Sequence, residues 1–444
     1  MIQDTPSIVP RLATALDGPL LELERHFLTR QADIERWFRS QWLKTPAPFY
    51  ASVDLRNSGF KLAPVDTNLF PAGFNNLSPE VESLCIQAVQ SAAERLVPDC
   101  RGVSIVPEDH TRNLYYWQSI ARLVRFWELA GFTVHIGTLD PAVTEPQTVE
   151  LPDGGSLLRE PIQRQGKRIK TGDFSPCFIL LNNDLSSGFP DLLADLEQPV
   201  TPPLDMGWST RRKSTHFEQF NAVSDEFGEL LETDPWLINP LFRQCGEIDF
   251  QKREGEDCLA TNVAELRMKI KAKYNEYGID REPFIFVKAD SGTYGMNIMV
   301  VRGPEEIHDL NRKQRNKMAR GKGGSSVTRV LVQEGVYTFE TWGKDNAVAE
   351  PVVYMIDRFV VGGFYRVHTG RAHDENLNAP GMHFEPLAFA EPCNRPDKSR
   401  NPDDCANRFY AYGVVARLAA LAAAREQRQI AGATVSELRS AQHR

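Results

Sequence analysis

Lys288 and the glycines that follow it could bind phosphate groups. The segment 288–301 reads Lys-Ala-Asp-Ser-Gly-Thr-Tyr-Gly-Met-Asn-Ile-Met-Val-Val, and it begins and ends with apolar runs, at 284–287 and 298–301. This pattern predicts a strand, a turn and a second strand, with the lysine ammonium at the end of the first strand. Glycines in the turn would let backbone N–H groups approach phosphate oxygens, because no Cβ stands in the way. The residues that we expect to bind the phosphates are Lys288, Gly292, Thr293, Tyr294 and Gly295.

The order of lysine and glycine excludes three better-known nucleotide motifs. A Walker A loop needs Gly-Lys-Ser/Thr at the start of a helix. The dinucleotide fingerprint needs a helix after the first strand, and protein kinases place their glycine loop before the lysine. The remaining alternative to a phosphate site is an ordinary β-hairpin with a glycine turn and a surface lysine.

Two further segments could complete a nucleotide site. Gln333, Glu334 and the backbone of Val336 end an apolar strand, where they could hydrogen-bond an adenine edge and a ribose; the alternative is a glutamate that faces solvent. Lys213 ends the run Arg-Arg-Lys before an apolar, helix-like segment. It could supply a second cation on the opposite wall of a cleft, although three consecutive cations are also typical of a solvated face.

Asp66 and Asn68 could bind a metal ion. They lie two residues apart, so in an extended chain their side chains point to the same side. Mg²⁺ prefers such oxygen ligands and usually shares them with nucleotide phosphates. The alternative is an Asx-turn before Pro71.

Arg366 could bind a carboxylate. It follows two glycines, at 362 and 363, on a predicted strand, and a guanidinium can hold a carboxylate through two parallel hydrogen bonds. The loop behind it contains Asn376 and Asn378, whose amides could donate to an anion. The alternative for Arg366 is a structural salt bridge.

Composition narrows the class of protein. The chain has 444 residues, 41% apolar and 25% charged, with a net charge of −8, which is typical of a globular protein of two to four domains. The acidic balance argues against nucleic acid as the main partner. No apolar run is long enough to span a bilayer, and the first residues lack a signal-peptide pattern, so we expect no membrane partner and a cytoplasmic location. The seven cysteines are scattered, which argues against a disulfide framework or a zinc site.

The elements that must position these residues suggest an α/β (α+β) fold. A strand at 103–106, an amphipathic helix at 114–130 and a strand at 132–136 form a βαβ pattern, which predicts a parallel, helix-covered sheet. We also expect strands at 50–56, 330–336, 348–356 and 359–368, a loop at 60–77, and an alanine-rich helix at 406–428. The basic stretch 311–329 is predicted to be either a flap over the phosphates or a surface loop. The predicted domains are 1–195 (substrate-binding), 196–283 (linker and first nucleotide-binding subdomain) and 284–444 (second nucleotide-binding subdomain and C-terminal helix).

Taken together, these segments resemble the ATP-grasp enzymes, and most closely the proteobacterial-type glutamate–cysteine ligase family. The resemblance covers nearly the whole chain, and its most specific parts are 65–77, 288–298 and 364–381. A second likeness connects Asp66-Thr-Asn68 to the acidic-x-Asn metal segment of eukaryotic-type glutathione synthetases. The chain departs from bacterial ATP-grasp enzymes because no Glu-x-Asn metal pair follows residue 381. The metal ligands would then be Asp66 and Asn68, or the alternatives Glu350, Asp357 and Glu375.

The resemblance implies a reaction and its participants. ATP would phosphorylate the γ-carboxylate of L-glutamate, and the amine of L-cysteine would attack the acyl phosphate, giving γ-glutamylcysteine; the implied cofactors are ATP and Mg²⁺. Lys288 and Arg366 would be catalytic. Another carboxylate–amine ligase, such as glutathione synthetase, and a non-catalytic nucleotide-binding regulator stay open as alternatives, and a homo-oligomer is compatible with the sequence. The implied substrate-binding residues are Arg56, Asn75, Asn76, Arg366, Asn376 and Asn378.

Overall fold

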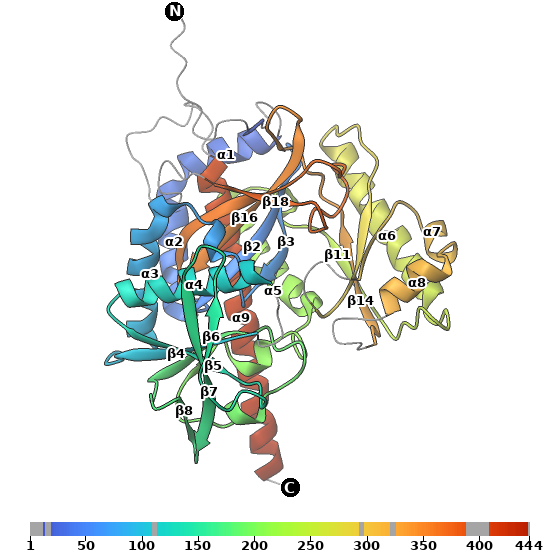
Figure 1. Cartoon of the computed structure of the whole chain (residues 1–444). Helices are drawn as coiled ribbons and strands as arrows, with labels where there is room; N and C mark the ends of the chain where they lie inside the picture. The colour runs from blue at the N-terminus through green and yellow to red at the C-terminus, as the bar shows by residue number, and fades with distance from the viewer. Residues whose placement is uncertain are drawn as a thin grey trace, which may run out of the picture.

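A computed structural model gives the arrangement of the chain (Figure 1). The strands of the described residues form three sheets, and helices pack on and between them, so the mixed α/β class is confirmed. The residues that the structure describes are 12–13, 19–108, 113–292, 297–319, 326–387 and 408–442.

The central sheet joins segments from both ends of the chain. β2 (Tyr50–Asn57) pairs antiparallel with β3 (Leu62–Asn68) on one side and with β16 (Ala347–Ile356) on the other. β17 (Phe359–His368) follows β16 as its antiparallel neighbour. The strands predicted around 50–56, 348–356 and 359–368 are therefore confirmed. The remaining strands of this sheet are β1 (Leu12–Ala13), β15 (Thr341–Trp342) and β18 (His383–Pro386).

The predicted loop at 60–77 is wrong for its first half, because 62–68 is strand β3. The backbone N–H of Ser58 donates to the carbonyl of Lys61 at 2.9 Å, which closes a tight turn between β2 and β3. The second half keeps a loop with a short helical turn at Phe74–Asn76. The abundance of Asn, Pro and Gly pointed to a loop, but pairing with β2 decides the first half.

The second sheet carries the predicted βαβ unit. β4 (Gly102–Pro107) and β5 (Thr133–Thr138) are parallel, and α4 (Leu114–Leu129) connects them. Most of this sheet is parallel, as predicted, while β6 and β8 pair antiparallel with β7. The other elements are α3 (Glu82–Leu96), β6 (Gln147–Glu150), β7 (Ser156–Gln165), β8 (Arg168–Thr171), β9 (Phe178–Asn182) and β10 (Val200–Thr201).

The third sheet contains the predicted hairpin. β12 (Ile285–Ala289) pairs antiparallel with β13 (Ile298–Val301) and with β14 (Arg329–Glu334), and β11 (Phe242–Gly246) completes the four strands. The basic stretch is partly helical rather than a loop, because 312–319 forms α8; residues 320–325 lie outside the described part. The helices of this region are α6 (Glu256–Glu276), α7 (Glu305–His308) and α8 (Arg312–Ala319).

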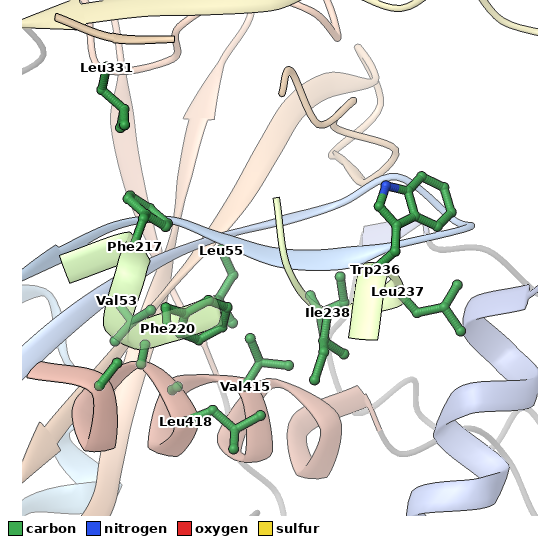
Figure 2. Close-up of a cluster of buried hydrophobic side chains, with 14 of the residues drawn as sticks. Val53, Leu55, Phe217, Phe220, Trp236, Leu237, Ile238, Leu331, Val415 and Leu418 are labelled. Atoms are coloured by element: carbon green, nitrogen blue, oxygen red, sulfur yellow. The ribbon is translucent and has the colours of Figure 1, made fainter. Parts of the chain in front are cut away.

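The C-terminal helix α9 (Arg408–Gln442) runs through the main core. Its alanines are small, so neighbouring elements can approach its axis closely. Figure 2 shows Val415 and Leu418 of this helix facing Phe220 of α5 (Lys213–Leu231) and Val53 of β2. The core thus fixes β2 and α5, the two elements that contribute Arg56 and Lys213. The N-terminal helices α1 (Pro19–Thr29) and α2 (Gln31–Lys44) also belong to this core.

No helix in the described part of the chain is long and apolar enough to cross a membrane. The central sheet combines residues 50–68 with residues 341–386, so its pairing crosses the predicted boundary at 195. The division into three domains stays a prediction.

Candidate active site

A polar cleft lies where the central sheet faces the third sheet. Side chains from β2, β3, β16 and β17 line one side, and side chains from β12 and β13 line the other. The cleft brings together many of the predicted site residues with several others. Its lining residues are Asp54, Arg56, Val65, Asp66, Lys213, Phe286, Lys288, Ala289, Gly292, Ile298, Glu350, Arg366, Asn376 and Asn378.

Lys288 is almost fully buried near the end of β12. Its Nζ donates to Gln333 Oε1 at 2.7 Å and to the carbonyl of Val65 at 3.0 Å. Burial lowers the pKa of Lys288 to about 7; Asp66 opposes this shift, and the positive charge of Lys213 adds to it. The surface-lysine alternative is thereby excluded. Among the described residues no carboxylate contacts this ammonium directly, and an incoming anion would stabilise its charged form.

Lys213 reaches the same cleft from the first turn of α5. Its Nζ lies 2.7 Å from each carboxylate oxygen of Asp66 and 4.3 Å from the ring centroid of Trp208. Burial would raise the pKa of Asp66, but Lys213 and Lys288 together hold it below the ordinary value. Asp66 is therefore a charged carboxylate beside two lysines, which is compatible with a role near polyphosphate and a metal ion.

The run 211–213 does not form a solvated face, because its members have different environments. Arg211 is buried, and its guanidinium donates to both oxygens of Glu426 on α9, at 3.0 and 2.9 Å. This buried pair anchors the start of α5 to the C-terminal helix, which fixes the position from which Lys213 enters the cleft.

Asp290 connects the two lysines. The backbone N–H of Lys213 donates to the carbonyl of Asp290 at 2.7 Å. The Asp290 carboxylate accepts from the backbone N–H and from the hydroxyl of Ser214, each at 2.8 Å. An acidic side chain at the start of a helix is also favoured by the helix dipole. Asp290 therefore holds α5 against the end of β12, and with it the spacing between Lys213 and Lys288.

We expect Asp290→Ala to raise KM for ATP on the order of 10-fold, because loss of about 1.4 kcal/mol of positioning free energy has that effect. KM for the amino-acid substrates should change far less. Asp290→Asn should recover most of the loss, since its amide oxygen can still accept from the Ser214 N–H. Steady-state kinetics with each substrate varied in turn would check this split, and an equal change in every KM would contradict the positioning role.

Arg366 lines the same cleft within a network of acids. Its Nη1 contacts Asp54 Oδ2 at 3.0 Å and Glu350 Oε1 at 2.5 Å. Arg56 holds the other oxygen of Glu350 through its Nε, at 3.1 Å. Burial would lower the pKa of Arg366, but Asp54 and Glu350 raise it well above its ordinary value, so the guanidinium stays charged.

The two glycines before Arg366, Gly362 and Gly363, are explained by the backbone around them. A Cβ on Gly363 would lie 2.4 Å from the carbonyl of Val352 on β16, and Gly362 has a φ of +152°. The register between the two strands also shifts at Tyr354 and Met355. This irregular, closely packed segment sets the twist with which β17 delivers Arg366 into the cleft.

The residues predicted for adenine and ribose are placed differently from the lysines. The carboxylate of Glu334 is buried, and it accepts from Lys61 Nζ at 2.6 Å, from Trp236 Nε1 and from the backbone N–H of Leu241 at 2.9 Å. Its role towards a nucleotide would require exchange of these partners. Gln333 holds Lys288, and the carbonyl of Val336 accepts from Arg56 at 3.2 Å. None of the three lines the cleft.

Several other predicted residues are not brought into the cleft. Asn68 exchanges hydrogen bonds with the backbone of Phe70, at 3.0 and 3.2 Å, which is the Asx-turn alternative. Asn75 and Asn76 contact each other at 3.3 Å within the short helical turn Phe74–Asn76, outside the cleft lining. Of the alternative metal ligands, Glu350 lines the cleft, whereas Asp357 pairs with Arg95 and Glu375 with Arg371. Thr293, Tyr294 and Gly295 lie outside the described residues.

Two acidic residues at the site, Asp54 and Asp290, were not predicted from the sequence. Asp54 lines the cleft. The sequence pattern could have revealed it, because Ser52, Asp54 and Arg56 alternate with apolar residues in the strand 50–57, which places them on one face. Asp290 follows Lys288 by two residues, but its contact with the start of α5 joins elements far apart in the chain.

Comparison with known proteins identifies the family. A model of the glutamate–cysteine ligase family matches residues 24–427. The chain belongs to this family. A solved structure from Methylobacillus flagellatus KT that carries the name gamma-glutamylcysteine synthetase is 57% identical; the match covers 96% of this chain and 100% of that one, with a TM-score of 0.88. A glutathione synthetase-like effector from Globodera pallida is 8% identical over 82% of this chain and 80% of that one, with a TM-score of 0.35. No curated protein matches.

Membership of the glutamate–cysteine ligase family confirms the predicted enzyme class. The ligase uses ATP to join glutamate and cysteine into γ-glutamylcysteine. The family match favours this reaction over the glutathione-synthetase alternative and over a regulator without catalysis.

Proposed function

We propose that the cleft is the active site, and that its two ends bind the two parts of the reaction. The observation that carries this proposal is the presence of two groups of cations in one cleft. Lys213 pairs with Asp66 beside Lys288, and Arg56 and Arg366 both pair with Glu350. In the proposal each group marks one end. The first end suits polyphosphate, and the second suits the carboxylates of an amino acid. We also propose that the third sheet and the central sheet are the ATP-grasp pair that encloses ATP.

At the phosphate end, Lys288 and Lys213 would neutralise the phosphoryl group as it passes from ATP to the γ-carboxylate of glutamate. Phosphoryl transfer needs positioning and charge stabilisation more than covalent help from the protein. Both lysines are held by partners with defined geometry, so little reorganisation is needed when charge develops. Gly292 borders this end, where its lack of a side chain leaves the backbone accessible.

One acidic residue at this end, Asp66, could contribute to a Mg²⁺ site. In the described part of the chain, no group of three or more acidic, His or Cys side chains could hold a metal on its own. Mg²⁺ bound with ATP needs only one or two protein carboxylates, because phosphates and water supply its other ligands. Asp66 is the first candidate, since its carboxylate is charged and partly exposed in the cleft. When bound, Mg²⁺ would neutralise phosphate charge; Asn68 as a second ligand stays a prediction.

At the amino-acid end, Arg366 would bind a carboxylate of glutamate. Its Nη1 is fixed by Asp54 and Glu350, while its Nη2 donates to no residue in the described part of the chain. Asn376 and Asn378 lie at the same end and could donate amide hydrogen bonds. Arg56 supports this end from behind, because its guanidinium contacts Glu350 and two backbone carbonyls.

The assignment predicts release of ADP that depends on all three substrates. Purified protein with ATP, Mg²⁺, L-glutamate and L-cysteine should form ADP and γ-glutamylcysteine in equal amounts, and chelation of Mg²⁺ should stop the reaction. A parallel reaction with γ-glutamylcysteine and glycine, the substrates of glutathione synthetase, should show no turnover. ADP release without dependence on cysteine would contradict the proposal.

A further inference from the structure

Asp54 has one carboxylate oxygen that no other described residue engages. Its Oδ2 accepts from Arg366 Nη1 at 3.0 Å. Its Oδ1 accepts no hydrogen bond from any residue in the described part of the chain. The side chain is 23% exposed and lines the cleft, so Oδ1 is accessible to a bound molecule.

The other two acids of the cleft lack such an oxygen. Both oxygens of Glu350 contact arginines, and its side chain is only 3% exposed. Both oxygens of Asp66 contact Lys213 at 2.7 Å. Among the described residues that line the cleft, Asp54 is therefore the acid with an unengaged carboxylate oxygen.

The pairing of Asp54 with Arg366 matches the charge pattern of an amino acid. An α-ammonium and an α-carboxylate are attached to the same carbon, so a site for both needs an anion and a cation side by side. Asp54 and Arg366 provide this arrangement on β2 and β17, facing one cleft. A dicarboxylate without an amino group would leave the Asp54 oxygen without a partner, which costs binding free energy in a partly desolvated site.

We propose that Asp54 binds the α-ammonium of the amino acid whose carboxylate is phosphorylated, and so selects an α-amino acid over a plain dicarboxylate. This assignment rests on the proposed active site. It explains why the Asp54 carboxylate lies beside Arg366, where a carboxylate of the substrate is proposed to bind. Burial raises the pKa of Asp54 even though Arg366 lowers it, and a bound ammonium would hold the carboxylate in its charged form.

The test compares L-glutamate with glutarate, which has the same two carboxylates but no amino group. The wild type should show a kcat/KM for glutarate lower by on the order of 10²-fold or more, because a site that accepts an N–H hydrogen bond rejects analogues lacking it. Asp54→Asn should lose on the order of 10²-fold in kcat/KM for glutamate, while its kcat/KM for glutarate stays within about 3-fold of the wild type. KM for ATP should not change.

The control variant is Asp357→Asn, which removes a carboxylate that pairs with Arg95 away from the cleft; its preference for glutamate should equal that of the wild type. An equal loss on glutamate and glutarate in Asp54→Asn would overturn the proposal and indicate a structural role. If a higher Mg²⁺ concentration restored the activity of Asp54→Asn, the proposal would be overturned, and Asp54 would be assigned as a metal ligand.

Two measurements keep the proposal testable if a step fails. If Asp54→Asn does not fold, the wild-type enzyme can still test the assignment. Equal kcat/KM values for glutamate and for glutarate or N-acetyl-L-glutamate would overturn it. If the wild type shows no turnover with cysteine, the proposed function fails separately. Calorimetric binding of glutamate and glutarate would then still test Asp54, and equal affinities would overturn its role.

Discussion

Replacement of Lys288 by alanine should lower kcat on the order of 10³-fold, the effect seen when one preorganised donor to a developing charge is removed. The loss should not come from unfolding. Lys288 carries a buried charge whose pKa is already lowered by burial, and its removal leaves no acid without its partner, because its hydrogen bonds go to a carbonyl and an amide oxygen. ADP release and thermal unfolding of the variant would check both parts.

The variant Lys288→Arg tests whether the lysine's titration controls ATP binding, because arginine keeps a positive charge at this position. The free protein holds Lys288 with a pKa of about 7, so the lysine is protonated below pH 7 and loses its charge above it. ATP binds the protonated form better, so its affinity should fall as the pH rises from 7 to 8.5, with proton uptake on binding in this range. An arginine stays charged throughout, so this fall should disappear in Lys288→Arg. Calorimetry in buffers of different ionisation enthalpy measures the uptake. Full activity of Lys288→Ala, or a wild-type affinity without pH dependence, would contradict the phosphate assignment.

Replacement of Arg366 by alanine should have two large effects. kcat/KM for glutamate should fall at least on the order of 10³-fold, because the carboxylate loses its guanidinium. The free energy of unfolding should also fall by about 3–5 kcal/mol, because Asp54 and Glu350 then share a buried site with fewer cations. Kinetics on the folded fraction and thermal unfolding measure the two effects separately.

Arg358→Ala is the matched control for Arg366→Ala. Arg358 is an exposed arginine in the turn between β16 and β17, and it packs against the ring of Phe359. Its removal should leave both kcat/KM and stability nearly unchanged. If Arg366→Ala were as stable and as active as Arg358→Ala, the network at the amino-acid end would have neither of the roles proposed for it.

The sequence predicted those parts of the fold and the site that depend on local patterns. The two strands of the lysine–glycine hairpin and the βαβ unit both follow from short local patterns, and both were confirmed. Glu334 and Asn68 show the limit of such reasoning. Each ends a strand with a polar side chain, as a ligand-binding residue would, yet Lys61 engages Glu334 and the backbone of Phe70 engages Asn68. These partners depend on tertiary packing, which a short motif does not reveal.

Asp54 and Asp290 were missed for a related reason. Their importance comes from contacts with Arg366 and Ser214, which lie 312 and 76 positions away along the chain. The family resemblance supplied the reaction, but it could not supply these residues, because no motif that carried the resemblance contains Asp54, and Asp290 has no distinct role within the lysine–glycine motif. Strand register and the joining of distant segments decide which polar side chains meet.

The joining of β2 to β16 also has a consequence for biosynthesis. Arg56 meets Glu350 across 294 positions of sequence, so the amino-acid end of the cleft cannot form on a ribosome that has made only the first three quarters of the chain. Such distant pairings make folding slow. Until β16 emerges, the edge of β2 and the charged side chains that will later be buried have no partners. We therefore expect chaperones to bind the nascent polypeptide at this strand.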